Sequence, residues 1–229
     1  MTDTTAAILR RARDLISTPE RWTKESYGRD ASGARVNVYG DGAVCFCSMG
    51  ALYVAGDDSD SGVRGALNVL RAVLGIVARA AIRPGMLALE PSAGEGAIAR
   101  ALRDAGAVVH CREIDYGRCE KLRAEGFTVT QGDFMTLPLT RMFDRVVMNP
   151  PFGKRADVAH VTRAFGALHP GGRLVAIMSA GVQFREDREC SAFRELVAAS
   201  KGSIDALPDG SFTESGTGVR TVVVTMEVT

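Results

Sequence analysis

The sequence predicts an α/β fold built on a mostly parallel sheet with helices on both faces. From residue 86 onward, short apolar runs alternate with segments of helical periodicity, which is the pattern of the βαβ units that form parallel sheets. The last two apolar runs, 203–207 and 219–228, follow one another without a helix between them. We therefore expect an antiparallel hairpin at one edge of the sheet, because parallel strands need a longer crossover connection, usually a helix.

The first 80 residues do not follow this alternation. Apolar residues recur at helical spacing over residues 6–17, and residues 63–80 predict a second long helix. Segment 81–85, which contains Pro84 and Gly85, predicts a domain boundary. We expect a small, mainly helical accessory module at residues 1–80 and the α/β domain at residues 81–229. Cys45 and Cys47 lack a second ligand pair for zinc, so we expect buried thiols in a strand.

The elements of the α/β domain are short and regularly spaced. Each apolar run is short enough for a strand buried on both faces, and each intervening segment carries apolar residues at helical spacing. The five expected parallel strands cover residues 86–90, 108–113, 127–130, 143–148 and 173–178, and the expected helices cover residues 96–105, 116–125, 157–168 and 188–199.

Composition excludes several classes of protein. Of the 229 residues, 46% are hydrophobic and 24% are charged, as in globular proteins, and no apolar run approaches the length of a membrane span. The N-terminus has no signal peptide pattern, and the five cysteines show no disulfide spacing. We therefore predict a cytoplasmic protein with no membrane partner and no metal site. The net charge of +1 means that contacts with phosphates would come from a local patch. The oligomeric state stays open.

A glycine-containing turn follows the first expected strand, at the end where open α/β sheets bind ligands. Gly94 and Gly96 allow the backbone to turn tightly and to approach a ligand, and the next helix offers free amides at its start. Glu95 alone also fits a helix N-cap. With Ala99 the turn satisfies the dinucleotide fingerprint G-x-G-x-x-A, which keeps a nicotinamide-dependent oxidoreductase as an alternative. The candidate binding residues of this segment are Glu90, Pro91, Ser92, Gly94 and Gly96.

Acidic residues follow the first three expected strands. Glu113, with Ile114 after it, ends the second strand, where an acidic side chain can bind the hydroxyls of a ribose. Asp133 follows the third strand, where its carboxylate can accept a hydrogen bond from an adenine amino group, with Phe134 against the ring. Taken singly, each carboxylate also fits a solvated strand end or a turn. Together with the carboxylates of the glycine turn, Glu90 and Glu95, they place acidic groups at three successive strand ends. With no basic residue in the turn, this arrangement indicates a site for a zwitterionic or cationic nucleoside.

The tetrapeptide Asn149-Pro150-Pro151-Phe152 follows the fourth expected strand directly. The two prolines stiffen the backbone and have no amide donors, so their carbonyl groups can only accept hydrogen bonds. Asn149 adds a side-chain acceptor and Phe152 adds a flat apolar face. Two acceptors beside a ring suit a planar group that carries an NH2, such as the edge of a nucleobase. A rigid turn that closes the strand is the alternative interpretation.

Taken together and in this order, these segments resemble the motifs of the class I S-adenosylmethionine-dependent methyltransferases. The similarity covers residues 82–228 and points to the amino-methylating branch that includes the DNA adenine-N6 enzymes. It implies a Rossmann-like, seven-stranded sheet whose last strand is antiparallel, and S-adenosylmethionine as the cofactor. It places Glu90, Gly94 and Gly96 at the methionine end of the cofactor, Glu113 at the ribose, and Asp133 and Phe134 at the adenine, with Pro91, Ser92, Ile114 and Asn149 completing the cofactor-binding set.

The sequence upstream of the first strand departs from this branch. Its Thr-Pro motif, which touches the methionine carboxylate, has no counterpart here, and residues 63–80 take its place. Residues 1–80 are instead similar to a small uncharacterised domain of bacterial and phage proteins. These departures argue against sequence-specific recognition of a DNA duplex by the mode usual in this branch.

The resemblance implies methyl transfer to an exocyclic amino nitrogen, with adenine N6 in DNA ranked first. Asn149 and Pro150 would accept hydrogen bonds from the amino group and stabilise the charge that develops on it, Pro151 would stiffen this segment, and Phe152 would stack on a base flipped out of the duplex. The alternatives are an RNA base (adenine N6 or guanine N2), a protein glutamine, a nucleotide-binding module without catalysis, and the oxidoreductase named above.

Further residues have weaker interpretations. Lys154 and Arg155 could meet a phosphate near the target nucleotide or lie in a solvated loop. The loop 209–218 could carry Phe212 over the substrate or form an ordinary hairpin connection. We assign three remaining residues to packing or to the surface: Trp22, His110 and His160.

Overall fold

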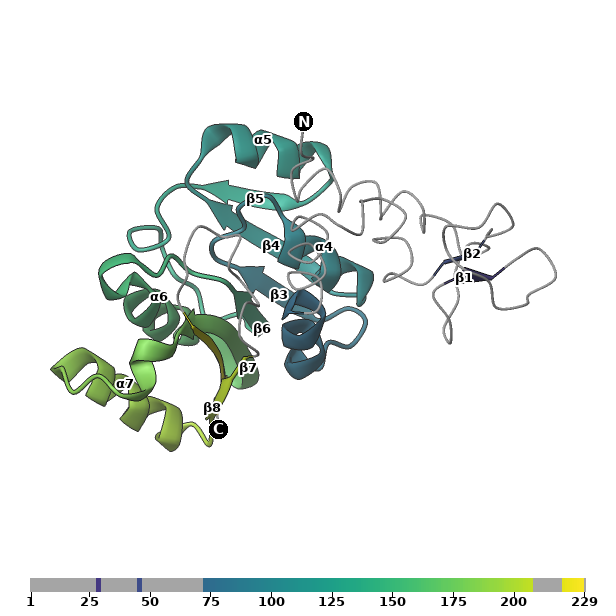
Figure 1. Cartoon of the computed structure of the whole chain (residues 1–229). Coiled ribbons are helices and arrows are strands. Elements are labelled where there is room, and N and C mark those ends of the chain that lie inside the picture. Colours follow the sequence, from purple (N-terminus) through teal and green to yellow (C-terminus); the bar gives the residue numbers. More distant parts are fainter. Residues whose placement is uncertain (1–27, 30–44, 47–71, 208–219, 229) are drawn as a thin grey trace, which may run out of the picture. The chain divides into compact units, whose positions relative to one another are not determined.

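The computed structural model describes residues 28–29, 45–46, 72–207 and 220–228 (Figure 1). The chain divides into two compact units, one made of residues 1–71 with 210–217 and one made of residues 72–209 with 218–229. In the first unit the described elements are β1 (Gly28–Arg29) and β2 (Cys45–Phe46), which pair antiparallel. Residues 72–80 are helical and belong to the second unit, which therefore begins before the boundary that we expected near residue 81.

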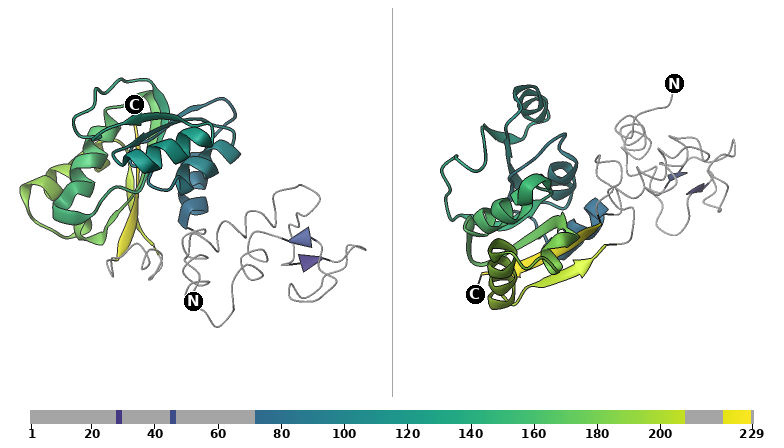
Figure 2. Two further views of the ribbon diagram at one scale, coloured as in Figure 1. Left: turned by 90° about the horizontal axis from the view of Figure 1, so that it is seen from above. Right: turned by 60° about the vertical axis from the view of Figure 1, so that its left-hand side comes forward.

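The second unit is built on a seven-stranded sheet (Figures 1 and 2) with the order β5-β4-β3-β6-β7-β9-β8. The five strands from β3 to β7 pair in parallel, whereas β9 is antiparallel to both β7 and β8. The mostly parallel sheet and the antiparallel edge hairpin predicted from the sequence are thereby confirmed. The strands are β3 (Leu87–Glu90), β4 (Val108–Glu113), β5 (Thr128–Gln131), β6 (Phe143–Met148), β7 (Leu168–Ser179), β8 (Ser203–Ala206) and β9 (Thr221–Glu227).

The order of the strands reverses direction between β3 and β6. From β3 the chain proceeds outward to β4 and β5, and from β6 it proceeds the other way. Right-handed crossovers then place α4 and α5 on one face of the sheet and α6 and α7 on the other. Such a reversal is where open α/β sheets bind ligands, beyond the carboxyl ends of the strands. The helices are α4 (Ala97–Asp104), α5 (Tyr116–Ala124), α6 (Ala156–Phe165) and α7 (Arg188–Ala199), with short 3-10 turns η2 (Gly153–Arg155) and η3 (Ala180–Gln183).

The start of β7 differs from the sequence prediction. The strand begins at Leu168 instead of residue 173, and α6 ends at Phe165 instead of residue 168. Leu168 pairs with Phe143, but the next pairing joins Arg145 to Arg173, so residues 169–172 bulge opposite Asp144. The bulge contains Pro170-Gly171-Gly172, and these residues interrupt the apolar run from which the strand was predicted.

An ion pair fixes this bulge at the end of the sheet opposite the ligand-binding edge. His169 Nε2 lies 2.8 Å from Asp144 Oδ1, and the amide of Leu87 donates to Asp144 Oδ2 at 2.7 Å. The hydrogen bond to Asp144 raises the pKa of His169. Burial by itself would raise the pKa of Asp144, but the bonds from His169 and Leu87 hold it below its usual value. The pair therefore joins β3, β6 and β7.

One large hydrophobic cluster lies between the centre of the sheet and the helices α6 and α7. Fully buried apolar side chains from β6, β7 and β9 meet Val161 of α6 and Phe193 of α7, which is only 2% exposed. This packing fixes the strands whose carboxyl ends carry the candidate site. Among the residues that the structure describes, no helix is long and apolar enough to span a membrane.

Candidate functional site

Four neighbouring strands bring the predicted site residues to one edge of the sheet. Glu90 ends β3, Glu113 ends β4, Asp133 follows β5 and Asn149 follows β6. The strands are parallel and adjacent in the order β5-β4-β3-β6, so their carboxyl ends share this edge. The edge includes the reversal between β3 and β6, where a bound ligand is expected.

The carboxyl group of Glu90 is buried and incompletely paired. Its side chain is 1% exposed, and Oε2 has no hydrogen-bond partner among the described residues. Burial raises the pKa of Glu90 well above its usual value, and the amide of Ala99 and the charge of Arg100 oppose this only in part. A buried carboxyl with a free oxygen suits a cationic ligand group, because a cation would stabilise its charged form.

The two glycines of the turn differ in what they face. Both adopt left-handed conformations, with φ of 53° at Gly94 and 81° at Gly96. A Cβ atom at Gly96 would lie 2.6 Å from Leu122 Cδ2 of α5, whereas one at Gly94 would meet nothing within 4 Å. Gly96 therefore lies closely against Leu122 of α5, and Gly94 leaves an open approach to the backbone. Pro91 is buried and Ser92 is half-buried at the start of the same turn.

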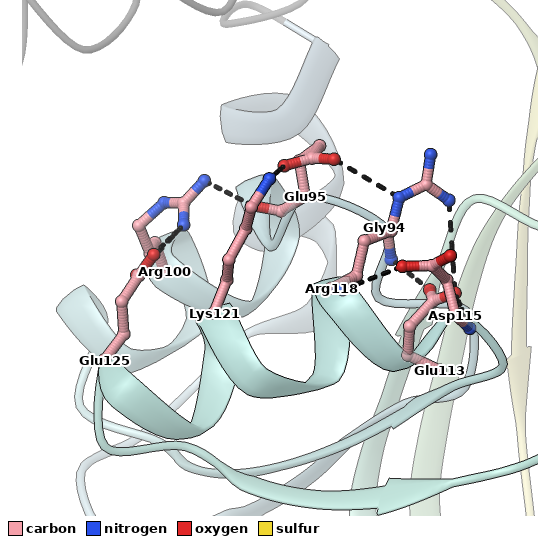
Figure 3. Close-up of polar contacts among 8 residues, drawn as sticks. All are labelled: Gly94, Glu95, Arg100, Glu113, Asp115, Arg118, Lys121 and Glu125. Atoms are coloured by element: carbon pink, nitrogen blue, oxygen red, sulfur yellow. Dashed lines mark hydrogen bonds and ion pairs between the residues drawn. The ribbon is translucent and has the colours of Figure 1, made fainter.

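Glu113 ties this turn to the end of β4 (Figure 3). Its Oε2 accepts a hydrogen bond from the amide of Gly94 at 2.7 Å, and its Oε1 accepts from the amides of Ile114 and Asp115 at 3.0 and 2.9 Å. The side chain is 6% exposed, so Glu113 is not a solvated strand end. Three backbone bonds occupy most of the acceptor capacity of a carboxylate, which is about four lone-pair positions. One position remains for a ligand hydroxyl.

A network of ion pairs joins the outer side of the turn to α5 (Figure 3). Glu95 pairs with Arg118 at 3.2 Å and with Lys121 at 3.5 Å. Arg100 pairs with Glu125 at 2.9 Å and donates to the backbone carbonyl of Glu95 at 2.7 Å. The N-cap of α4 is Gly96, so the capping role considered for Glu95 is not present. Exposed pairs of this kind contribute little each, but together they orient the turn.

Asp133 and Phe134 lie in different environments although they are adjacent. Asp133 is exposed, and its Oδ1 accepts from the amide of Met135 at 2.8 Å, so it forms the turn that was one of its interpretations. Phe134 is 3% exposed and belongs to the hydrophobic core, where its ring centroid lies 5.7 Å from that of His160. The structure therefore brings Asp133 to the ligand edge but buries the ring of Phe134 behind it.

The side-chain oxygen of Asn149 has no donor. Oδ1 is buried and accepts no hydrogen bond within the part of the chain that the structure describes. Pro150 is buried beside it, Pro151 is exposed and Phe152 is half-buried. An acceptor left without a donor costs free energy, and this cost is recovered if a ligand N–H group binds there. The role of Asn149 and Pro150 as paired acceptors stays a prediction.

The turn after the tetrapeptide is strained and tethered. Lys154 and Arg155 have φ of 52° and 62°, a left-handed backbone conformation that is unfavourable for residues other than glycine. Arg155 pairs with Asp187 at 3.4 Å and with Glu189 at 3.3 Å at the start of α7. Its guanidinium therefore already has two carboxylate partners, which weakens its proposed contact with a phosphate. Lys154 is exposed and makes no ion pair with any residue in the described ranges.

Two further residues follow β6 and β7 and were not singled out from the sequence, since an isolated Asp or Phe carries no periodic signal. Asp157, at the start of α6, is 3% exposed and accepts from the amide of Ser179 at 3.0 Å, which joins α6 to the end of β7. Phe184, just beyond β7 and η3, is 71% exposed. Burial lowers the pKa of His160, although Asp133 and Asp157 oppose this, and its Nδ1 has no partner among the described residues.

The remaining interpretations concern packing and metals. His110 packs edge-on against Phe143, with ring centroids 5.7 Å apart, as expected of a packing residue. Within the described ranges no cluster of His, Cys, Asp and Glu could hold a metal, and the thiols of Cys111, Cys119 and Cys190 are free. Trp22, Cys47 and the whole loop 209–218 with Phe212 lie outside the described residues, as does the side chain of Cys45.

Comparisons with known proteins place the fold. Residues 1–110 match a family of unknown function, DUF6197, and this match runs through the glycine turn into β4. A search of curated proteins finds no match. Among solved structures, a dimethyladenosine transferase from Plasmodium falciparum is similar with a TM-score of 0.53 and 18% identity, over 68% of this chain and 61% of that one.

Two further structures show how widely this fold is used. The 23S rRNA methyltransferase ErmE aligns with a TM-score of 0.51 and 21% identity, over 69% of this chain and 68% of that one. A geranyl diphosphate methyltransferase in complex with SAM aligns with a TM-score of 0.53 and 12% identity, over 76% and 93% of the two chains. At these identities the likeness shows the fold, so the Rossmann-like methyltransferase fold predicted from the sequence is confirmed.

Proposed function

We propose that this protein transfers a methyl group from S-adenosylmethionine to an exocyclic amino nitrogen of a nucleobase, with adenine N6 in DNA as the first candidate. The observation that supports the proposal is Oδ1 of Asn149 at the end of β6, which is buried and has no hydrogen-bond partner among the described residues. It lies at the ligand-binding edge of a sheet shared with known methyltransferases. An amino group conjugated to a ring is a donor that fits this acceptor and the carbonyl of Pro150.

The residues along β3, β4 and β5 fit the cofactor. Glu90 offers to the cationic end of the molecule a buried oxygen that no described residue pairs with, and the open face of Gly94 allows close approach to the backbone. Glu113 retains one acceptor position for a ribose hydroxyl. Ile114 is 66% exposed and offers an apolar surface at the end of β4. Asp133 then faces the adenine, whereas the buried Phe134 supports it from behind.

The catalytic contribution of the chain is to hold the acceptor nitrogen. Bound S-adenosylmethionine supplies a methyl group on a sulfonium, and its displacement requires mainly positioning. Asn149 Oδ1 and the Pro150 carbonyl would each accept a hydrogen bond from one N–H group of the acceptor. The nitrogen lone pair would then turn out of conjugation with the ring and toward the methyl group. The same acceptors stabilise the positive charge that develops on nitrogen. Phe152 stacks on the base, and the surplus proton leaves to solvent.

The alternatives concern the molecule that carries the amino group. RNA is the second candidate, because two of the similar structures are a dimethyladenosine transferase and a 23S rRNA methyltransferase. Protein glutamine is the third, since an amide NH2 also fits the two acceptors. The geranyl diphosphate methyltransferase shows that the same fold serves acceptors without nitrogen. A module that binds S-adenosylmethionine without catalysis remains a further alternative.

Two measurements test the proposal in sequence. Calorimetry with S-adenosylmethionine and with NAD distinguishes a methyltransferase from an oxidoreductase. We expect S-adenosylmethionine to bind and NAD not to bind. Transfer of tritiated methyl groups is then measured over single-stranded DNA, duplex DNA, RNA and protein. Label in N6-methyladenine of DNA supports the first candidate, label in RNA alone selects the second, and binding without transfer to any acceptor contradicts the catalytic role.

A further inference from the structure

The loop after β5 is held by residues far away in the sequence. Residues 132–142 connect β5 to β6 without a helix. The carbonyl of Asp133 accepts from the amides of Thr136 and Leu137, both at 3.0 Å, and its Oδ1 accepts from Met135. These bonds close one tight turn. They leave the carbonyl groups of later residues to partners outside the loop.

Two guanidinium groups supply those partners. Arg163 of α6 donates from Nε to the carbonyl of Phe134 at 2.9 Å and from Nη2 to that of Leu137 at 2.6 Å. Arg112 of β4 donates from Nη2 to the carbonyl of Pro138 at 2.8 Å. The loop that presents Asp133 is thus held from both sides, by a strand of the sheet and by the helix that follows the tetrapeptide.

This arrangement is unfavourable for the charges themselves. The guanidinium carbons of Arg112 and Arg163 lie 5.6 and 5.7 Å from the ring centroid of Phe134. Neither forms an ion pair with a carboxylate in the described part of the chain. Burial and the nearby charge of Arg163 both lower the pKa of Arg112. Two like charges around one buried ring need compensation, and the compensation visible here is contact with the ring and with the loop carbonyls.

We propose that Arg112 and Arg163 are positioning residues for Asp133. They thereby set the selectivity of the cofactor site for adenine, whose exocyclic amino group donates to Asp133. The inference rests on the proposed function. Asp133 directly precedes the clamped Phe134, and its Oδ2 accepts no hydrogen bond from any described residue. A rigid loop keeps that oxygen aimed at the amino group. A loose loop lets it turn toward solvent and accept from water.

The test compares two ligands that differ only at the amino group. S-adenosylhomocysteine carries a 6-amino group, and its purine analogue carries a hydrogen atom at that position, so N1 stays an acceptor in both. Calorimetry on the full chain should show that the wild type binds S-adenosylhomocysteine about tenfold more tightly, as one hydrogen bond to a charged acceptor predicts. Arg163→Met and Arg112→Met should each bring the two affinities to near equality. Arg163→Lys, which keeps the charge but not the paired donors, should lose most of the preference.

Controls separate positioning from stability. Asp133→Ala should abolish the preference, whereas Arg141→Met should keep it, although Arg141 also donates from this loop to a carbonyl, that of Leu168 at 3.2 Å. Circular dichroism at the binding temperature restricts the comparison to folded variants. If the wild type binds neither ligand, the proposed function fails. If it prefers the amino ligand and the folded arginine variants keep that preference, or if Arg141→Met also loses it, the positioning role is overturned.

Discussion

At the scale of single residues, the candidate site is marked by polar atoms that the fold leaves without partners. Glu90 Oε2 and Asn149 Oδ1 are both buried, and neither has a hydrogen bond from a described residue. Buried polar atoms are normally paired, so each exception calls for an explanation such as a water or a ligand. The other exceptions among the described residues are Arg112 Nη1, His160 Nδ1 and Thr225 Oγ1. One is an acid at the end of β3 and the other an amide at the end of β6, on the two strands where the order of the sheet reverses.

The buried carboxyl makes a prediction about protons. Because burial raises the pKa of Glu90, the group holds a proton in the free protein until the pH passes this raised value. A cationic ligand favours the carboxylate and lowers this raised pKa, so binding of S-adenosylmethionine should release a fraction of one proton at pH values between the pKa of the complex and that of the free protein. Calorimetry in two buffers with different ionisation enthalpies measures this release. Glu90→Gln should remove it, while the exposed control Glu95→Gln should not. Equal release from wild type and Glu90→Gln would refute the assignment.

At the scale of elements, the turn between β3 and α4 is shaped by its neighbours as much as by its own sequence. Glu113 of β4 holds the amide of Gly94, and the side chain of Leu122 in α5 closes over Gly96. The sequence predicted a tight turn that can approach a ligand at both glycines. The open space at Gly94 suits that prediction, whereas Gly96 faces the side chain of Leu122.

The two glycines should therefore respond differently to the same substitution. Gly96→Ala adds a Cβ 2.6 Å from Leu122 Cδ2 at a φ of 81°, so it should lower the free energy of unfolding by about 1–3 kcal/mol. Gly94→Ala meets no neighbour within 4 Å and should cost only about 1 kcal/mol from its backbone conformation. Urea unfolding measures both. Gly94→Ala should nevertheless weaken binding of S-adenosylmethionine more than it weakens the fold, and a larger loss of stability at Gly94 than at Gly96 would be inconsistent with this packing.

Sequence patterns predicted the regular elements better than the contacts between them. The predicted helix 188–199 agrees with α7 (Arg188–Ala199), because its periodicity is uninterrupted. The start of β7 was missed because Pro170-Gly171-Gly172 hides a bulged pairing. Phe134 beside Asp133 suggested a ligand-facing ring, yet it is buried between arginines from β4 and α6. Such contacts join distant segments, and no local pattern encodes them.

At the scale of the whole molecule, the two ends of the sheet have separate tasks. The carboxyl ends of the strands carry the candidate site, and the amino ends are joined by Asp144 and His169. The hydrophobic core between them holds β6, β7 and β9 against α6 and α7. Stability at one end can therefore be changed without altering the groups at the other.

The Asp144–His169 pair predicts how stability depends on pH. The pKa of His169 is raised in the folded state, so its contribution is fully present below the unfolded pKa of about 6.5 and is lost as the pH rises through the folded value. The pKa of Asp144 is lowered, so its contribution is present above about 3.9 and is lost as the pH falls through its folded value. Since His169 is 40% exposed, solvent screening limits the effect to below about 1 kcal/mol.

Urea unfolding of the wild type and His169→Gln isolates this term. The difference in unfolding free energy between them should be largest near about pH 6 and should shrink by about pH 9. Taking the difference removes the opposite contribution of His160, whose pKa is lowered and which both proteins retain. A difference that is constant over this range would show that the pair does not titrate as described.

Asn149 holds the acceptor amino group in the proposed mechanism, and its replacement by alanine tests this role. Methyl transfer from tritiated S-adenosylmethionine is compared between the wild type and Asn149→Ala on the best acceptor, with cofactor affinity measured on the same samples. Loss of the acceptor oxygen should reduce turnover at least about a hundredfold, while affinity for the cofactor changes by less than about threefold. Near-normal turnover by Asn149→Ala would contradict the account.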